Sequence, residues 1–147
     1  MYEIFIVILV LLDQVSKVFM QNFLEYGNSV AILDGVFHLT YVENRGAAFG
    51  LFENMQVFFI IVAVIVTVVG LVYIHKSETS KLAKISICLI IAGAIGNLID
   101  RVKMGYVVDF FDFRFIWNYV FNIADVFVVI GTLLLCIYLL KSGKEEN

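Results

Sequence analysis

The chain has 147 residues, of which 62% are hydrophobic, with a mean hydropathy of +0.98 and no proline. Soluble domains contain about 45–50% apolar residues, so this composition argues against a soluble domain and predicts a protein embedded in lipid. A formal net charge of −3 and the lack of a basic stripe argue against nucleic acid as a partner.

Four apolar segments of membrane length are predicted, at residues 4–23, 55–74, 82–101 and 120–140. The second has no charged residue over twenty positions, which is about one bilayer crossing. The other three contain charged residues within the apolar run. Together the segments use more than half of the chain, so we expect a mainly α-helical integral membrane protein with a single domain over residues 1–147.

The first segment resembles a cleaved signal peptide only in its hydrophobicity. Its opening charge is Glu3 rather than a lysine cluster, no small-residue cleavage site follows, and Asp13 interrupts the apolar core. We therefore expect a retained first helix.

The connections on either side of the middle two segments differ in pattern. Residues 36–42 alternate apolar and polar side chains, which is the period of a half-buried strand. Residues 106–121 are crowded with aromatic side chains around Asp109 and Asp112. Because Trp and Tyr favour the membrane–water interface, we expect this second connection to be an aromatic-rich outer loop.

Lysine and arginine predict the orientation of the chain in the membrane. Each side carries five, but on one side they are concentrated in the short segments 75–84 and 141–147. The positive-inside rule weights short loops near helix ends. We therefore expect both termini and the 75–84 turn to be cytoplasmic.

Three aspartates interrupt the apolar segments, and up-and-down threading places Asp13, Asp100 and Asp125 on the same, outer side. Burying one carboxylate in a membrane costs about 2.5–3.5 kcal/mol on insertion scales, so a cluster at one depth indicates a site. Asp109 and Asp112 raise the number of outer-side aspartates to five. Composition and spacing do not choose a reacting pair among them.

Other residue types exclude several chemistries. His38 and His75 are the only histidines and lie on opposite sides, which argues against a histidine-based zinc site and a histidine-activated nucleophile. Cys88 and Cys136 lack the spacing of a metal site or a redox pair. We expect both cysteines to be packing residues.

What remains is carboxylates with amide neighbours. Asn97 lies three residues before Asp100, and Asn122 lies three residues before Asp125, so each pair shares a helical face. Ala92, Gly93 and Gly96 are small enough for another helix to come close. Two carboxylates about 3 Å apart share one proton, and such a pair can activate water and protonate a leaving amine. This is aspartic-protease chemistry.

Structural roles remain open for the same residues. Asp13 and Lys17 have the spacing of an intrahelical ion pair, and Asp100 with Arg101 can close a helix end. Acids within membranes also mark ion pathways in transporters, although a transporter would distribute its carboxylates across the membrane depth. A non-catalytic anchoring protein, the third alternative, needs no paired acids.

Five motifs occur in order: DQVSK from Asp13, ENRGAAFG from Glu43, GNLIDR from Gly96, VVDF from Val107 and FNIAD from Phe121. Over nearly the whole chain, this sequence resembles the bacterial lipoprotein signal peptidases (signal peptidase II). The resemblance implies four transmembrane helices and a small extracytoplasmic β-cradle between the first two. It also implies an aspartic endopeptidase that cleaves prolipoproteins on the N-terminal side of the diacylglyceryl-modified cysteine.

By the same resemblance, the catalytic aspartates are Asp109 and Asp125, and Asp112 is not one of them. Residues that bind substrate or support the two aspartates are Asp13, Asn44, Arg45, Asn97, Asp100, Arg101 and Asn122. Val126 follows the second catalytic aspartate, where many members carry a small polar residue. On a helix this neighbour points about 100° away from Asp125, so we expect the chemistry to be unaffected.

The resemblance also implies the partners and the location. We expect prolipoprotein substrates and membrane lipids as partners, no metal, no cofactor, and activity as a monomer. The location is the bacterial cytoplasmic membrane, with the active site near its outer face, so that acyl chains of the substrate can remain in lipid. The polar 40–50 region and the aromatic 106–121 loop are expected to close over the peptide.

Overall fold

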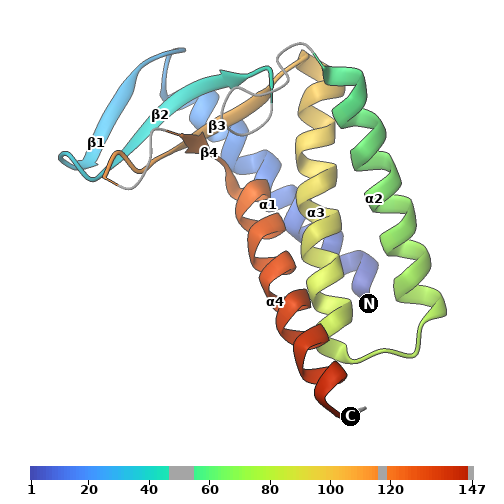
Figure 1. Ribbon diagram of the computed structural model, residues 1–147. Coiled ribbons are helices and arrows are strands. Elements are labelled where there is room, and N and C mark those ends of the chain that lie inside the picture. Colours follow the sequence, from blue (N-terminus) through green and yellow to red (C-terminus); the bar gives the residue numbers. More distant parts are fainter. Residues whose placement is uncertain (47–54, 116–118, 146–147) are drawn as a thin grey trace.

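The computed structural model describes residues 1–46, 55–115 and 119–145. In this part of the chain, four helices form a bundle and a small sheet lies at one end of it (Figure 1). The helices are α1 (Tyr2–Phe23), α2 (Gln56–Lys76), α3 (Lys81–Met104) and α4 (Ile123–Glu145). The two termini and the α2–α3 connection lie toward the end of the bundle away from the sheet.

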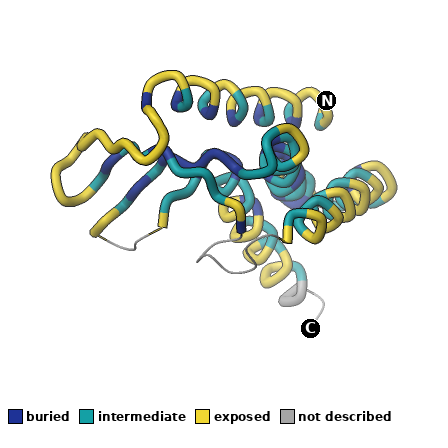
Figure 2. Tube along the Cα trace, turned by 90° about the horizontal axis from the view of Figure 1, so that it is seen from above, coloured by how far each residue is buried: buried dark blue, intermediate teal, exposed yellow. Residues whose placement is uncertain are grey.

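Helix α3 lies centrally and packs against each of the other three helices (Figure 2). Its side-chain cap is Ser80, whose hydroxyl accepts a hydrogen bond from the backbone N–H of Ala83 at 3.2 Å. It ends at Gly105, which has a φ of 85° and donates its N–H to the carbonyl of Arg101. Glycine adopts this left-handed conformation without steric cost, so the chain can turn directly into the sheet.

Glycines of α3 permit this central position. A Cβ atom on Gly93 would collide with the backbone oxygen of Ala124 in α4. A Cβ atom on Gly96 would come 2.5 Å from Oδ2 of Asp13 in α1. The prediction that these small residues allow other helices to come close is therefore confirmed, and the close approach brings polar groups of three helices together.

By length and composition, three helices among the described residues could cross a membrane: α2, α3 and residues Ile123–Ser142 of α4. Large apolar side chains on their outer surfaces are exposed, including Val57 at 69% and Leu133 at 58%. Such exposure is unfavourable in water and is expected in lipid. Helix α1, the fourth predicted span, is not among these three, so its crossing of the membrane stays a prediction.

The sheet contains β1 (Ser29–Leu33), β2 (Phe37–Asn44), β3 (Val107–Asp112) and β4 (Val120–Phe121), antiparallel and in that order. The strand predicted at residues 36–42 corresponds to β2. Two other expectations are corrected. The 106–121 connection contains β3 and β4 rather than only an aromatic loop, and the sheet is therefore not confined to the connection between α1 and α2.

The start of the last helix is also corrected, because residues Val120–Phe121 pair with β3 and α4 begins only at Ile123. Residues 47–50 of the ENRGAAFG motif and residues 116–118 of the aromatic connection lie outside the described part of the chain. Whether either connection closes over a peptide therefore stays a prediction.

The sheet is attached to the bundle through a second apolar core. Met20 and Leu24, at the end of α1, pack with Tyr41 of β2 and with Val108 and Phe110 of β3. Every residue of β3 except Phe111 is buried. This packing holds β3 against the ends of α1, α3 and α4, where the aspartates predicted from sequence meet.

Candidate active site

Reciprocal hydrogen bonds at the start of α4 fix the position of Asp125. The side-chain oxygen of Asn122 accepts from the backbone N–H of Asp125 at 3.0 Å, and Oδ2 of Asp125 accepts from the backbone N–H of Asn122 at 3.1 Å. This is the geometry of a capping box. The sequence NIAD thus starts the helix and orients a carboxylate at its N-terminal end.

Strand β3 presents Asp109 to the same place. Asp109 is 2% exposed, and its two oxygens accept from Nδ2 of Asn122 at 2.6 Å and from Nδ2 of Asn44 at 2.8 Å. Asn44 lies on the neighbouring strand β2, where Val42 pairs with Asp109. Both donors are neutral amides, so they hold the carboxyl group without adding a positive charge.

Burial raises the pKa of Asp109 from its ordinary value of 3.8 to about 7, with the negative charge of Asp125 as the next cause. Hydrogen bonds from Asn44 and Asn122 and the charge of Lys17 act in the opposite direction. We refer to Asp109 and Asp125 as the carboxylate pair. With this raised pKa, Asp109 can keep its proton near neutral pH.

Asn97 of α3 connects the carboxylate pair to the rest of the bundle. Its Nδ2 donates to Oδ1 of Asp125 at 2.8 Å, and its Oδ1 accepts from Nδ2 of Asn122 at 3.1 Å. Asn122 therefore donates to both Asp109 and Asn97. The two carboxyl groups belong to one continuous hydrogen-bond network that joins β2, β3, α3 and α4.

A second group of charges lies beside this network, and we call Asp13, Lys17 and Asp100 the ion cluster. Nζ of Lys17 lies 2.9 Å from Oδ2 of Asp13 and 2.9 Å from Oδ2 of Asp100. All three side chains are buried. The other oxygen of Asp13 accepts from the backbone N–H of Ala124 at 2.9 Å, so the ion cluster also positions the start of α4.

Asp100 accepts further hydrogen bonds from Nε2 of Gln14 at 2.9 Å and from the backbone N–H of Val108 at 3.2 Å. The first bond crosses from α1 to α3, and the second joins α3 to β3 directly next to Asp109. Asp100 is thus the residue of the ion cluster that holds the strand of the carboxylate pair in place.

The two predicted arginines have different surroundings. Arg101 donates from Nη2 to the carbonyl of Gly46 at 3.2 Å, and its guanidinium lies 4.8 Å from the ring centroid of Phe59. Arg45 is mostly exposed and forms an ion pair with Glu43 at 3.2 Å. Arg101 therefore joins α3 to the end of the β2 segment, whereas the Arg45 side chain is mostly exposed.

Asp112 lies elsewhere. In a strand, residues three apart point to opposite faces, and the partners of Asp112 differ accordingly from those of Asp109. Its Oδ2 accepts from Oγ1 of Thr40 at 2.7 Å and from Nε of Arg114 at 2.9 Å. This cation-paired carboxylate takes no part in the network around Asn122.

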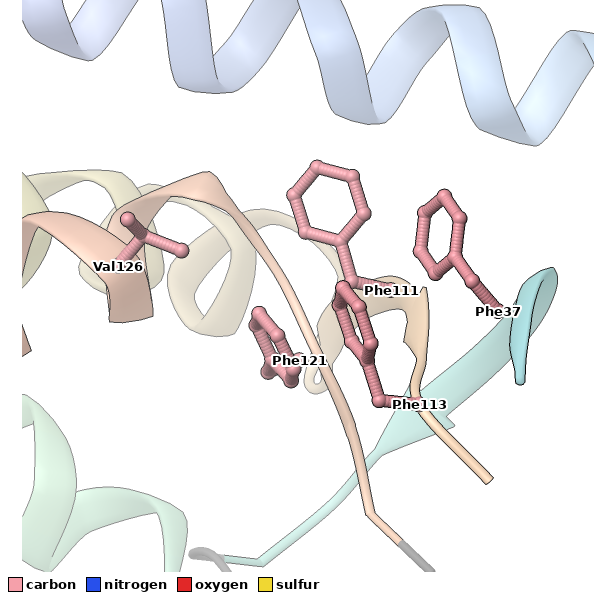
Figure 3. Close-up of a pocket in the computed structure, with 5 residues that line it drawn as sticks. All are labelled: Phe37, Phe111, Phe113, Phe121 and Val126. Atoms are coloured by element: carbon pink, nitrogen blue, oxygen red, sulfur yellow. The ribbon is translucent and has the colours of Figure 1, made fainter. Parts of the chain in front are cut away.

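An apolar pocket of about 320 Å³ is lined by residues of β2, β3, β4 and α4 and of the segment after β3 (Figure 3). Four phenylalanines and one valine line it: Phe37, Phe111, Phe113, Phe121 and Val126. Phe111 follows Asp109 by two residues on β3, while Phe121 and Val126 flank the Asn122–Asp125 cap. The pocket places an apolar surface beside the polar network.

The predicted site residues are thus brought together, with Asp109, Asp125, Asn44, Asn97 and Asn122 in one network and Asp13 and Asp100 in the adjoining ion cluster. Sequence reasoning missed the contacts of Gln14 and Lys17 with α3. For Lys17, the four-residue spacing from Asp13 predicted the ion pair within α1 but not the contacts with α3.

Two carboxyl groups are thus held by amides in one hydrogen-bond network at one end of a bundle of apolar helices. Comparisons with known proteins identify the family. The sequence model of the signal peptidase (SPase) II family matches residues 5–141. This chain therefore belongs to the signal peptidase II family.

Individual relatives have nearly the same length. A lipoprotein signal peptidase of Clostridioides difficile (strain 630) is 57% identical over 140 residues, which are 95% of this chain and 95% of that protein. Another, of Halothermothrix orenii, is 47% identical over 144 residues, 98% of each chain. A bacterial membrane enzyme determined by the in meso method at 2.3 Å resolution has a TM-score of 0.92 and 32% identity, covering 99% of this chain and 91% of that chain.

The protein is therefore a hydrolase of an aspartic-type peptidase family and an integral membrane protein, and its family processes prolipoproteins. The expectation drawn from the five motifs is confirmed at this level.

Proposed function

We propose that this protein removes the signal peptide from diacylglyceryl-modified prolipoproteins, cleaving on the N-terminal side of the lipidated cysteine with Asp109 and Asp125 as its catalytic dyad. The observation that carries the proposal is the link through Asn122. This residue donates to Asp109 at 2.6 Å and caps the helix that begins beside Asp125. Both carboxyl groups are thereby directed to one place by neutral groups.

The reaction uses one proton on the carboxylate pair. Asp125, ionised, takes a proton from water while the water oxygen attacks the scissile carbonyl carbon, and Asp109 gives its proton to the carbonyl oxygen. In the second half, Asp125 gives its new proton to the nitrogen of the lipidated cysteine as the C–N bond breaks. Asp109 then recovers a proton as the new carboxylic acid forms.

The amides and arginines have separate roles in this proposal. Asn97 and Asn122 keep the carboxylate pair oriented, and Asn44 holds the protonated member, Asp109, from the neighbouring strand. The exposed guanidinium of Arg45 is available to bind a carbonyl group of the substrate. The phenylalanine pocket beside Asp125 suits the apolar part of a lipid-modified precursor.

We propose further that α1 is a fourth membrane span. Its 22 residues extend about 33 Å at 1.5 Å per residue, enough to cross a hydrocarbon core of about 30 Å. Ile4, Leu11 and Phe19 are each more than half exposed on its outer side, whereas Asp13 and Lys17 are buried against α3. The two charges in the middle of α1, Asp13 and Lys17, therefore do not face lipid, and Glu3 lies in its first turn.

In this placement the protein is a multi-pass monomer of the bacterial cytoplasmic membrane. The lysines of the 75–84 and 141–147 segments favour a cytoplasmic position for both termini. The sheet and the carboxylate pair, at the opposite end of the bundle (Figure 1), then lie near the outer face, where a lipidated precursor arrives through the membrane.

The test is cleavage of a diacylated precursor by purified Asp109→Asn and Asp125→Asn variants. Each substitution keeps the side-chain size but removes the group that holds or accepts a proton. We expect a loss of turnover of at least about 10³-fold, with thermal unfolding still cooperative. Robust turnover by either variant would refute the assignment. Ion flux through vesicles that is lost in both variants would instead support a transport function.

A further inference from the structure

The ammonium group of Lys17 is buried where α1 meets α3, and the side chain is 2% exposed. An ammonium group has three protons to donate and no lone pair with which to accept. Three oxygens receive these protons: Oδ2 of Asp13, Oδ2 of Asp100 and Oδ1 of Asn97, each at 2.9 Å. Two of the three contacts neutralise carboxylates, but the third is to a neutral amide.

The contact with Asn97 determines which way its amide group faces. Its Oδ1 accepts from both Lys17 at 2.9 Å and Asn122 at 3.1 Å, and its Nδ2 donates to Asp125 at 2.8 Å. A reversed amide would set its NH₂ group against two donors and its oxygen against the Asp125 carboxylate. Since Lys17 can only donate, that reversed arrangement has no hydrogen bonds left to form.

The other amide of the network does not depend on Lys17. Asn122 is oriented by its own capping box, because its oxygen accepts the backbone N–H of Asp125. Asn97 has no such backbone anchor for its side-chain oxygen, which is held by Lys17 and Asn122 alone among the described residues. The direction of the hydrogen bond to Asp125 is therefore set by Lys17 of α1 together with Asn122.

We propose that Lys17 is a positioning residue for the hydrolytic reaction, which acts through Asn97 to keep an amide donor directed at Asp125. The inference rests on the proposed role of Asp109 and Asp125. It assigns to Lys17 a task beyond ion pairing with Asp13 and Asp100. A purely structural lysine would stabilise the bundle without affecting the chemistry at the carboxylate pair.

The main comparison is between Asp100→Asn and the double variant Lys17→Met/Asp100→Asn. Both lack the Asp100 carboxylate, so they differ only in the ammonium group and its hydrogen bonds. The double variant also keeps the net charge of the ion cluster, since one positive and one negative charge are removed together. Turnover of a diacylated precursor, KM and the pH profile are measured for both in detergent micelles, beside Asp109→Asn and Ile91→Ala.

Ile91→Ala is the matched control for stability. Ile91 is fully buried in the apolar core between the helices and makes no polar contact with the site. Its truncation lowers the thermal midpoint, as loss of buried side-chain volume does, but leaves Lys17 and Asn97 in place. It therefore reports what loss of stability alone does to kcat and to the pH profile.

Among the described residues, the charged groups around the carboxylate pair are Asp13 and Lys17 from α1 and Asp100 and Arg101 from α3. We expect kcat of the double variant to be about 10²-fold below that of Asp100→Asn, with little change in KM. The upper pH limit of activity of the double variant should lie higher than that of Asp100→Asn. The reason is that the positive charge of Lys17, which favours the ionised form of Asp109, has been removed. Ile91→Ala should keep the upper pH limit of the unmodified protein.

Equal kcat and an unchanged pH limit in the two Asp100→Asn backgrounds would overturn the inference. If the double variant does not fold, the triple variant Lys17→Met/Asp13→Asn/Asp100→Asn replaces it. This variant leaves no charge in the cluster. It is compared with the unmodified protein by kcat and by the upper pH limit of activity. Normal turnover by Asp109→Asn would instead remove the proposed function itself. An inactive Asp109→Asn with a fully active Lys17 variant would remove only the role of Lys17.

Discussion

In the ion cluster, Asp13 and Asp100 each contact the ammonium of Lys17 at 2.9 Å, whereas Asp109 and Asp125 accept hydrogen bonds from amides and backbone N–H groups. Both regions bury carboxylates at the same end of the bundle. A cation interacts favourably with the charged form of a carboxylate that it contacts. Neutral donors hold a carboxyl group in place but leave its proton free to move, which catalysis requires.

Asn122→Asp tests whether the neutral donors are needed for activity and gives the largest expected effect. Aspartate is as good a helix cap as asparagine, so α4 should still begin at Ile123. The amide donor to Asp109, at 2.6 Å, is lost and replaced by an acceptor. We expect kcat to fall about 10²–10³-fold, as for loss of one oriented donor at an active site.

Asn122→Ala is the control, because it loses both the cap and the donor. Its thermal midpoint should fall by the equivalent of about 1 kcal/mol, while its kcat matches that of Asn122→Asp. Retained activity in Asn122→Asp would mean that capping, rather than the hydrogen bond to Asp109, is what Asn122 contributes.

The pH dependence tests the same difference without any substitution. Asp109 has a pKa raised to about 7, so below this pH it keeps the proton that the proposed reaction uses. Above it the proton is lost, and kcat should fall about tenfold per pH unit. An activity that stays constant up to pH 9 would contradict a shared proton.

The same shift has a consequence for stability. Because folding raises the pKa of Asp109 above its ordinary value of 3.8, the folded protein binds this proton more tightly than the unfolded chain does. The contribution of Asp109 to the free energy of unfolding therefore falls as the pH rises from about 4 to about 7. The proton at the carboxylate pair serves both the reaction and the fold.

Substitutions in the ion cluster should lower thermal stability more than substitutions in the carboxylate pair. Activity should show the reverse order. Asp100→Asn leaves Lys17 with one carboxylate fewer, and breaking a buried ion pair costs about 3–5 kcal/mol. This corresponds to a fall in Tm on the order of 10 °C for a chain of this size. Asp109→Asn removes a carboxyl group that accepts hydrogen bonds from the amides of Asn44 and Asn122, and it should leave Tm within about 3 °C.

Tm values measured by a thermal-shift assay in one detergent decide this prediction. Ile91→Ala gives the scale for the loss of a buried side chain without any change in charge. An equal fall in Tm for Asp100→Asn and Asp109→Asn would mean that the two regions are stabilised in the same way.

Some elements of the fold could be predicted from the sequence and others could not. Helices α2 and α3 follow from long apolar runs, and β2 follows from its alternating pattern. Strand β3 lies in the connection that its aromatic residues predict to be a loop, and VVDFFD does not alternate apolar and polar side chains. In the fold it is buried on both faces, by α1 on one side and the site on the other, so the pattern of a half-buried strand is absent.

Some contacts within the site could be predicted from the sequence and others could not. The spacing of Asn122 and Asp125, and of Asp13 and Lys17, is local and was read from helical geometry. The contact between Lys17 and Asn97 joins residues 80 positions apart, and that between Asn44 and Asp109 joins residues 65 apart. Such pairs depend on the packing of α1 on α3 and of β2 on β3, for which no single-sequence pattern exists.

Asp112→Asn has the smallest expected effect and completes the comparison of carboxylates. Asp112 is buried like Asp109, but it accepts from Arg114 at 2.9 Å and Thr40 at 2.7 Å on the opposite face of β3. Arg114 is half exposed, so this ion pair is worth about 1 kcal/mol or less. We expect kcat for a diacylated precursor to stay within about twofold of the unmodified protein, with the same upper pH limit. A complete loss of turnover would mean that burial in β3, rather than the choice between cationic and neutral partners, distinguishes the reacting acid.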